Sequence, residues 1–313
     1  MPVLCTGSVA IDHIMVYRGR FKDVILPDRL HVLNVAFHVP ELRHTFGGCA
    51  ANIAFNLKLL GGEPIVLATV GADDFSAYAA WLERHQISRE HILGIAGEST
   101  PGAYVTTDLD DNQITGFHPG AMDRAHEAAI SRVGDAYELA FVSPNGKRAM
   151  QEHARALKAG GKRALIDPGQ GIPLFERDEL IELIDGAALL FANDYEWALI
   201  QERTGLAERE IVGRVGAAIV TLGERGSRIH ERGHITEIAP VAARAVLDPT
   251  GCGDAYRAAF AHGLERGLSL ATCAKMGSVL GALLVERHGT QTLTLASGEF
   301  DAHYQRAFGE TIR

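Results

Sequence analysis

Residues 247–260 read LDPTGCGDAYRAAF, a glycine-containing turn followed by a run whose apolar residues recur at helical spacing. The positions of Tyr256, Ala259 and Phe260 predict a helix that begins in this turn. The start of a helix is a natural anion site because its backbone N–H groups are free, and glycines let an anion approach the backbone closely. The sequence nevertheless places a carboxylate, Asp254, at this position. An aspartate near a helix start is most often a cap, so Asp254 either caps the helix or takes a proton beside a bound phosphate.

A second glycine turn leads into a predicted helix in GGCAANIAFNLKLLGG, residues 47–62, where Ile53, Leu57 and Leu60 share one face and a Gly-Gly pair ends the helix. Strand-like and helix-like segments alternate through most of the chain. They are VLCTGSVA, IVLATV, FSAYAAWLERH, LAFVS, MQEHARALKAGG, RALIDP, LLFAND, EWALIQERTG, AAIVTLG and two final helices around 253–266 and 269–287. This alternation predicts an α/β fold with a mainly parallel central sheet and helices on both faces. Ligands bind such sheets at the carboxyl ends of the strands.

Two β-like stretches break the alternation. Residues 13–46 carry short mixed segments, HIMVY and HVLNVAFHV, without a convincing helix, and residues 101–118 predict a hairpin made of AYVTTD, a DLDDN turn and QITGF. We expect the two stretches to pair into a small β-sheet lid. The large α/β domain, which binds nucleotide and substrate, is then built from residues 1–12, 47–100 and 119–313.

Composition limits the class of protein. The chain has 313 residues, 47% of them hydrophobic, and a net charge of −9. Without a basic stripe to neutralise phosphates, nucleic acid and anionic membranes are excluded as partners. No apolar run approaches the about 20 residues of a membrane-spanning helix, and the N-terminal stretch lacks the basic start of a secretory signal, so we expect a cytoplasmic protein. The four cysteines form no CxxC pair, which indicates buried free thiols rather than a zinc site.

Four motifs in order along the chain resemble those of the ribokinase-like (PfkB) family of sugar and nucleoside kinases. GGCAANIAFNLKLLGG looks like the first family signature and DPTGCGDAYRAAF like the second. Between them lie NDYE, residues 193–196, and TLGERG, residues 221–226. The resemblance covers essentially the whole chain and implies a ribokinase-like fold and ATP-dependent phosphoryl transfer to a hydroxyl group.

The resemblance implies a catalytic role for the opening stretch. Asp254 matches the family's catalytic base, which accepts the proton of the substrate hydroxyl as its oxygen attacks the γ-phosphate. Gly251, Cys252 and Gly253 match the anion hole, whose backbone N–H groups stabilise charge on the transferring phosphoryl group. Alanine is the usual family residue at the position of Cys252. Because the anion hole is made of backbone groups, a cysteine at this position should leave activity intact. We expect the Cys252 thiol to be unreactive and not an activated thiolate.

Other matching positions would hold the nucleotide and metal ions. Asn193 and Glu196 match the NxxE motif that orders Mg²⁺ and its waters, and Mg²⁺ prefers oxygen ligands; without the resemblance, Glu196 reads as a solvated residue in the first turn of a helix. The residues expected to bind ATP are Asn193, Thr221, Gly223, Gly226, Ser278 and Ala282. The turn 248–250 and the loop after His288 resemble the places where some relatives bind a monovalent cation such as K⁺, a site that is optional in the family.

The acceptor is expected to be a furanose-containing compound. Asp12, Gly48 and Asn52 match positions that hydrogen-bond ring hydroxyls, and such a site strongly rejects analogues that lack them. The stretches TGSVAIDHI, GRFKDVILPDRLH, FHPGAMDRA and FANDYEWAL look closer to bacterial adenosine kinases than to ribokinases. Phe117 and Phe37 would give a purine an aromatic slot, and the alternative is that both are ordinary core residues of the small sheet. The same resemblance suggests Ser8 and Gln170 as further residues of the nucleoside pocket.

We therefore expect a kinase that transfers the γ-phosphate of ATP to the 5′-hydroxyl of a purine nucleoside, converting adenosine to AMP as in purine salvage. One alternative is a sugar kinase of the same family, acting on ribose, fructose or a related furanose. Another is a catalytically silent nucleoside-binding sensor, against which the retained Asp254 and Glu196 speak. The expected partners are these small molecules, and a homodimer through the lid, because relatives with a two-segment lid often dimerise through it.

Overall fold

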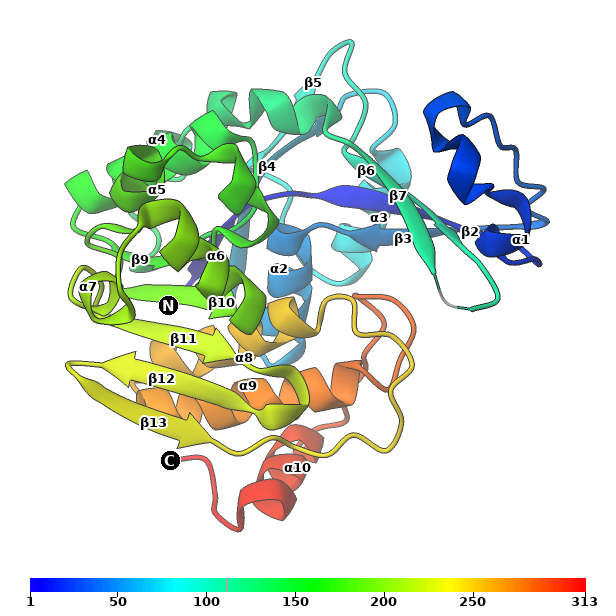
Figure 1. Ribbon diagram of the computed structural model, residues 1–313. Helices are drawn as coiled ribbons and strands as arrows, with labels where there is room; N and C mark the ends of the chain where they lie inside the picture. The colour runs from blue at the N-terminus through cyan, green and yellow to red at the C-terminus, as the bar shows by residue number, and fades with distance from the viewer. Residues whose placement is uncertain (111) are drawn as a thin grey trace.

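A nine-stranded sheet runs through the centre of the molecule (Figure 1). The computed structural model describes residues 1–110 and 112–313. The strand order is β13-β12-β11-β10-β9-β8-β1-β4-β5, and all neighbours from β11 to β5 are parallel, whereas β12 and β13 are antiparallel. The strands are β1 (Val3–Thr6), β4 (Pro64–Gly71), β5 (Ile92–Ile95), β8 (Leu139–Val142), β9 (Arg163–Ile166), β10 (Leu189–Asn193), β11 (Ala217–Thr221), β12 (Ser227–Glu231) and β13 (His234–Ile238). The mainly parallel sheet expected from the alternation is confirmed.

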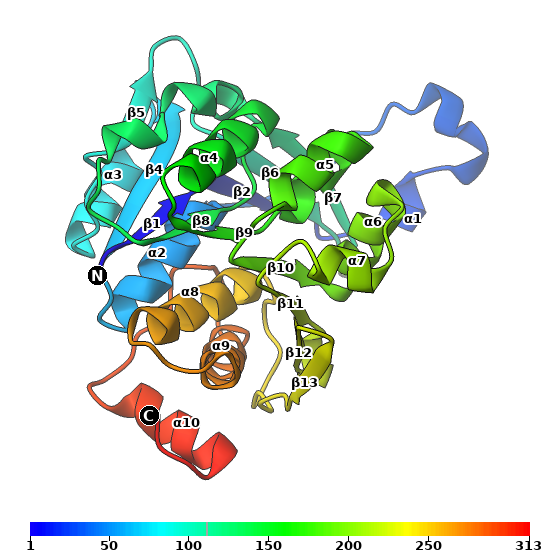
Figure 2. The same cartoon turned by 90° about the vertical axis from the view of Figure 1, so that its left-hand side faces the viewer.

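Helices cover both faces of this sheet, as the side view shows (Figure 2). In β1, Val3 and Cys5 point into the core under α2 and α8, while Leu4 points to the opposite core under α4 and α5. A strand buried on both faces has no polar side, which explains the continuous apolar runs in the sequence. The helices are α1 (Phe21–Val24), α2 (Cys49–Leu59), α3 (Ser76–Arg84), α4 (Lys147–Ala159), α5 (Arg177–Ile184), α6 (Asp194–Thr204), α7 (Glu208–Val212), α8 (Cys252–Glu265), α9 (Leu270–Leu284) and α10 (Glu299–Phe308). Short 3₁₀ helices span Pro27–Val32, Gly120–Glu127, Ile130–Arg132, Gly169–Leu174 and Gly223–Arg225.

The second sheet has four strands in the order β3-β2-β6-β7 and projects from the large domain. Its strands are β2 (Ala10–Val16), β3 (Glu41–Gly47), β6 (Gly102–Thr107) and β7 (Gln113–His118). Pairing of β2 with β6 joins the two distant β-like stretches of the chain, as expected. We call residues 13–46 and 101–118 the lid; these bounds remain a prediction, and the turn DLDDN within them includes residue 111, which lies outside the described residues.

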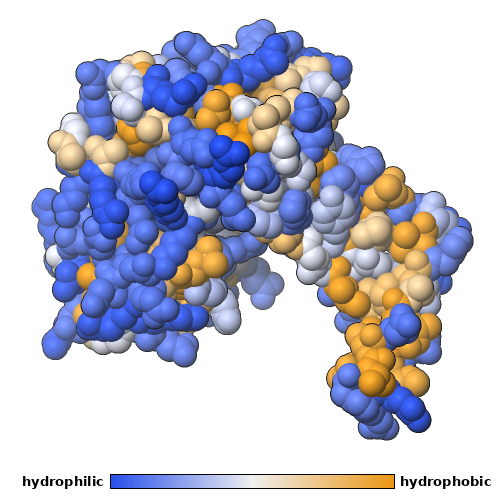
Figure 3. Space-filling model, turned by 90° about the horizontal axis from the view of Figure 1, so that it is seen from above, coloured by the Kyte–Doolittle hydropathy of each residue, from blue (hydrophilic) through white to orange (hydrophobic). Residues whose placement is uncertain are grey.

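The tip of the lid corrects one expectation. The segment HVLNVAFHV, residues 31–39, was expected to be β-like, but it begins at the end of a 3₁₀ helix and contributes no strand to the sheet. Extended residues form a strand only where a neighbouring strand accepts and donates their backbone hydrogen bonds. The tip instead leaves apolar side chains exposed, visible as the apolar end of the projecting arm in Figure 3. They are Val24, Leu26, Leu30, Val32 and Leu33.

No helix in the described part of the chain combines the length and apolarity that crossing a bilayer demands.

A third layer lies outside the sheet, where Phe300 and Tyr304 of α10 pack on α9. This layer borders the side of α9 on which the nucleotide residues Ser278 and Ala282 were expected.

Candidate active site

Asp254 is the third residue of α8, and its hydrogen bonds are not those of a cap. The N-cap residue is Gly251, which has φ +77° and carries no side chain to cap the helix. The Asp254 carboxylate accepts a hydrogen bond from Asn52 Nδ2 at 2.9 Å, and the described residues supply it with none from a backbone N–H. Burial raises the pKa of Asp254, and this rise is opposed by the Arg257 charge and by the Asn52 hydrogen bond. The carboxylate is therefore free to meet a substrate. The alternative that Asp254 caps the helix lacks the backbone hydrogen bond that a cap requires.

The start of α8 is built so that only small residues fit. A Cβ on Gly251 would lie 2.8 Å from Thr290 Cγ2, and one on Gly253 would lie 2.7 Å from Arg257 Nη1. Burial, followed by the charges of Asp248 and Asp254, raises the pKa of the Cys252 thiol to about 11. A neutral Cys252 thiol agrees with the expectation that this side chain is unreactive. The backbone of Gly251, Cys252 and Gly253 is thus the part of this turn that can meet an anion.

A buried ion pair lies directly beneath this turn. Arg257 Nη2 donates to Asp167 Oδ1 at 2.8 Å, and Arg257 Nε lies 2.5 Å from Asp167 Oδ2, with both side chains less than a tenth exposed. Burial disfavours the charge of Arg257, but Asp167 and Asp254 raise its pKa above the ordinary value. A fixed positive charge therefore lies against Gly253 of the expected anion hole.

On the acceptor side, Asp12 lies near Asp254 in β2, the strand that leads into the lid. Burial and the charges of Asp248 and Asp254 raise the pKa of Asp12 to about 6. The register places Asp12 opposite Ala103 and Ala103 opposite Phe117. Registered neighbours point to the same face of a sheet, so the half-exposed ring of Phe117 shares the face of Asp12.

Two of the expected pocket residues have structural roles in the same corner. Gly48 has φ +91°, and a Cβ there would lie 2.5 Å from Ser8 O and 2.6 Å from Ala10 N. Ser8 Oγ accepts a hydrogen bond from Cys49 N at 3.0 Å. Both residues therefore hold the first turn of α2 against the start of the lid, and this brings Asn52 to Asp254.

Phe37 and Gln170 lie differently from Phe117. Phe37 packs in an aromatic cluster at the lid tip, with ring centroids 5.1 Å from Tyr17 and 5.0 Å from Phe21. Its contacts are those of the alternative, an ordinary aromatic of the small sheet. Gln170 is exposed in the 3₁₀ helix that follows Asp167, and its role stays a prediction.

Asn193 and Glu196 form the capping box of α6. Asn193 Oδ1 accepts from Glu196 N, and Glu196 Oε2 accepts from Asn193 N, both at 2.8 Å. In the parallel register Asn193 lies beside Thr221, so the NDYE and TLGERG motifs meet at the ends of β10 and β11. The second oxygen of Glu196 remains available. In the described residues, no group of three or more His, Cys, Asp or Glu side chains is arranged to hold a metal ion. One carboxylate oxygen is the kind of ligand that Mg²⁺ uses together with water and nucleotide phosphates.

The remaining nucleotide positions divide into two groups. Gly226 has φ +88° and a Cβ there would collide with Ile238 O, so the turn between β11 and β12 requires glycine with or without a nucleotide. A Cβ on Gly223, in contrast, would have no atom within 4 Å, so neighbouring atoms do not exclude a side chain there. Ala282 lines a cavity of about 300 Å³ between the segment 240–244, α9 and α10, and Ser278 lies one turn earlier on α9.

The two stretches expected to hold a monovalent cation are joined by Asp248. Its carboxylate accepts hydrogen bonds from Gly289 N at 3.0 Å and Thr250 N at 2.9 Å. Burial works against the charge, but these hydrogen bonds hold the pKa of Asp248 below its usual range. K⁺ binding there stays a prediction.

Residues 3–296 match the pfkB family carbohydrate kinase. The chain belongs to the pfkB kinase family. A nucleoside kinase from Methanocaldococcus jannaschii is 32% identical over 93% of this chain and 92% of its own. The structure of Burkholderia thailandensis nucleoside kinase in complex with inosine has 40% identity and a TM-score of 0.90, with 99% of both chains covered. The complex of that protein with ADP-inosine has 41% identity and a TM-score of 0.87, over 99% of this chain and 97% of that one.

The expected family and ribokinase-like fold are thereby confirmed, and the protein is a phosphotransferase with an alcohol group as acceptor. Thermotoga maritima ribokinase, at 20% identity and a TM-score of 0.80 over 97% of this chain and 99% of that one, shares the fold. The match covers both signatures, so Asp254 and Asn52 lie within the pfkB region of the chain.

Sequence analysis of this pfkB kinase missed the residues that support Asp254 from behind. The charge of Arg257 inside the apolar run AYRAAF was a detectable signal, because a buried arginine needs a partner. Its partner Asp167 lies 90 residues away in the sequence. Thr290 and Gln291, in the loop after α9, belong to no sequence pattern that would indicate a role at the site.

Proposed function

We propose that this kinase transfers the γ-phosphate of ATP to the 5′-hydroxyl of a purine nucleoside, with adenosine as the acceptor and AMP as the product. The observation that carries the proposal is the Asp254 carboxylate at the glycine-lined start of α8, held by Asn52 and faced by Asp12. Full-length similarity to nucleoside kinases supports the substrate class, and inosine, the ligand of the Burkholderia protein, is the nearest competitor of adenosine.

In this proposal the chain positions two reactants and stabilises charge. Asp254 accepts the proton of the 5′-hydroxyl while the 5′-oxygen bonds to the γ-phosphorus and the bond to the leaving ADP breaks. Backbone N–H groups of Gly251, Cys252 and Gly253 face the charge on the transferred group, with Arg257 beneath them. Bound Mg²⁺, held at Glu196 through water, would neutralise phosphate charge.

The acceptor side distinguishes a nucleoside from a free sugar. Asp12 accepts hydrogen bonds from ring hydroxyls, which a free furanose also offers. Phe117 on the same face of the lid gives an aromatic surface, and only a substrate that carries a base gains from stacking on it. A nucleoside therefore uses both features, and a free sugar uses one.

A substrate panel tests the proposal. The protein is incubated with Mg²⁺ and ATP together with adenosine, inosine, ribose or fructose, and ADP release and the phosphorylated product are measured. We expect kcat/KM for adenosine to exceed that for inosine and for either sugar. A higher value for ribose or fructose would establish the sugar kinase alternative, and tight adenosine binding without ADP release would establish the silent sensor.

The proposed homodimer has a candidate surface on the lid. The face opposite Asp12 carries Leu42, Tyr104 and Ile114, which are 56%, 46% and 45% exposed. Exposed apolar faces of this kind favour association. Sedimentation of the wild type and of Leu42→Glu tests the proposal: we expect a dimer that the substitution weakens, and a monomeric wild type would contradict it.

A further inference from the structure

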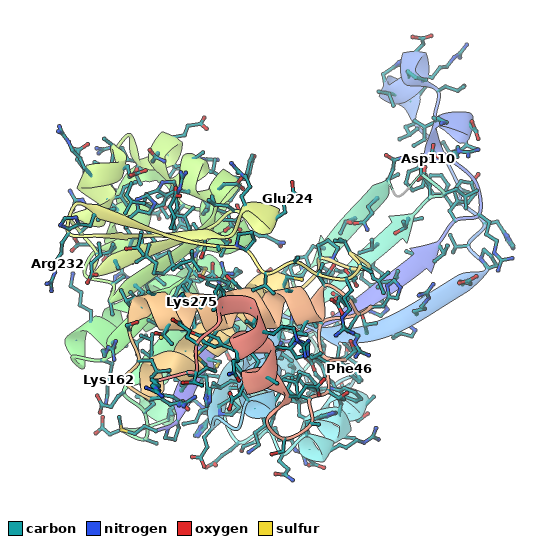
Figure 4. All side chains as sticks on the ribbon, turned by 90° about the horizontal axis from the view of Figure 1, so that it is seen from below. Phe46, Asp110, Lys162, Glu224, Arg232 and Lys275 are labelled. Carbon is teal, nitrogen blue, oxygen red and sulfur yellow. The ribbon has the colours of Figure 1, made fainter. Side chains whose placement is uncertain are left out.

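A chain of three hydrogen bonds, the middle one buried and the outer two partly buried, connects Trp81 of α3 to Asp254. Trp81 Nε1 donates to Gln291 Oε1 at 2.9 Å, Gln291 Nε2 donates to Asn52 Oδ1 at 3.0 Å, and Asn52 Nδ2 donates to Asp254 Oδ2 at 2.9 Å. These residues come from α3, the loop after α9, α2 and α8. They meet at the base of the lid, close to Phe46, which Figure 4 labels.

The chemistry of the end members sets the direction of every bond in this chain. The indole N–H of Trp81 can only donate, so the Gln291 side chain must present its oxygen there. The amide nitrogen of Gln291 is then directed to Asn52 Oδ1 and, at 2.6 Å, to the hydroxyl of Tyr78, which donates to Gly47 O at 2.8 Å. Each hydrogen of the Gln291 amide thus has one acceptor.

Asn52 is held in one orientation as a consequence. Its oxygen receives Gln291 Nε2 and also lies 2.8 Å from the hydroxyl of Thr290. The Asn52 amide nitrogen therefore faces Asp254, with one hydrogen on the carboxylate and the other left for a substrate oxygen. A flipped Asn52 would set its oxygen against the Asp254 carboxylate and leave the amide of Gln291 facing another N–H group.

Water cannot replace these partners. Gln291 and Asn52 are 3% and 4% exposed, and Tyr78 is fully buried. The ring of Phe46 stacks on Tyr78 with centroids 4.4 Å apart and closes the network on the lid side. A buried and fully connected polar network allows one arrangement of its members, whereas an exposed asparagine would sample several.

We infer that Gln291 is a positioning residue for phosphoryl transfer, because it fixes the orientation of the Asn52 amide and, through Asn52, the aim of the Asp254 carboxylate. The inference rests on the proposed function, in which Asp254 accepts the substrate proton. In this orientation the Asn52 amide can only donate to the substrate. A substrate hydroxyl beside Asn52 therefore accepts a hydrogen bond from the amide and donates its own proton to a carboxylate.

Two substitutions at Gln291 separate positioning from packing. Gln291→Glu keeps the shape and can still accept from Trp81, but an ionised carboxylate cannot donate to Asn52 Oδ1 and draws the Asn52 amide nitrogen away from Asp254. Gln291→Met removes all three hydrogen bonds of the Gln291 side chain but leaves the Thr290 hydroxyl beside Asn52 Oδ1 to orient Asn52. We expect Gln291→Glu to lower kcat by on the order of 10²-fold, and Gln291→Met to lower it less.

The pH profile is the second readout. Loss of the Asn52 hydrogen bond removes an interaction that favours the ionised carboxylate, so the acid limb of the kcat/KM profile should move to higher pH in Gln291→Glu. Packing alone predicts instead that kcat follows the thermal midpoint and that the acid limb stays in place. The matched control is Gln201→Glu in α6, where the amide donates to Trp197 O at 3.2 Å; it should leave kcat and the profile unchanged.

The outcomes distinguish this inference from the proposed function. A wild type that phosphorylates no nucleoside contradicts the proposed function. An active wild type whose Gln291 variants bind MgATP and retain both kcat and the acid limb overturns the role of Gln291 alone. Should Gln291→Glu fail to fold, Trp81→Phe provides a second test, because it removes the donor that orients Gln291 while keeping an aromatic ring against Phe46 and Phe55. It should move the acid limb in the same direction by less.

Discussion

Asp254 is partly buried and, among the described residues, accepts no backbone hydrogen bond, although it lies in the first turn of a helix. Its partner in this structure is Asn52, which approaches from another helix. Helix α8 therefore begins without a side-chain cap, at a glycine in the left-handed region. A substitution at this position tests chemistry separately from helix stability.

We expect Asp254→Asn to fold with a thermal midpoint close to that of the wild type, because the amide keeps the shape and removes only a partly buried charge. Turnover should fall by about 10²- to 10⁴-fold or more, the usual contribution of a positioned base. Calorimetry should show that MgATP still binds. Near-normal turnover in this variant would refute the role of Asp254 as the base.

Asp12 should make nucleoside binding pH-dependent. With its pKa raised to about 6, Asp12 is largely protonated below that pH and a carboxylate above it. Only the carboxylate accepts from two ring hydroxyls at once, so affinity for adenosine should rise as the pH increases through about 6 and then level off. Calorimetry without nucleotide measures this step, and Asp12→Asn should bind weakly at every pH with no step. A step of equal size in the variant would assign the titration to another group.

In helix α6, one residue pair serves both local structure and the expected metal. The capping box of Asn193 and Glu196 explains why an NxxE spacing suits the start of a helix. A glutamine at the third helical position keeps this box, whereas it gives up the charge that Mg²⁺ requires. Stability and metal dependence can therefore be separated by a single substitution.

Glu196→Gln should leave the thermal midpoint nearly unchanged and raise the Mg²⁺ concentration needed for half-maximal rate. The control is Glu210→Gln in α7, where Glu210 likewise accepts from the backbone, at Ala207 N and 2.8 Å. Rates measured across a Mg²⁺ titration compare the two variants. An unchanged requirement in Glu196→Gln would remove Glu196 from the metal site, and the same increase in both variants would indicate a general charge effect.

In the whole molecule, the lid carries Phe117, and Asp12 lies in the strand that leads into it, beside a site whose other residues belong to the large domain. Closure over both substrates would exclude water from phosphoryl transfer. Residues 13–46 and 101–118 should therefore become protected from hydrogen exchange when adenosine and a non-hydrolysable ATP analogue are bound. Helix α5, which packs on the face of the large sheet away from α8, serves as the internal reference. Unchanged exchange in both lid segments at saturating ligand would contradict the lid hypothesis.

Much of the fold was predictable because its signals are local. Alternating apolar runs and helical periodicity predicted the parallel sheet and its helices, and glycines marked the starts of α2 and α8, since φ +91° at Gly48 and φ +77° at Gly251 suit no other residue well. Short-range backbone geometry and side-chain period are properties of a few neighbouring residues, so they can be read without knowing the rest of the chain. The HVLNVAFHV segment shows the limit of this rule, because a β-like pattern becomes a strand only beside another strand.

The supporting residues of the site were decided by tertiary structure alone. Arg257 meets Asp167 across 90 residues of sequence, and Gln291 meets Asn52 across 239. A hydrogen bond between distant residues leaves no periodic trace, because its energy depends on atoms that are brought together only when the chain closes and water is excluded. The motifs thus named the carboxylate and its glycines, whereas the folded chain determined which amide faces that carboxylate and which charge lies beneath it.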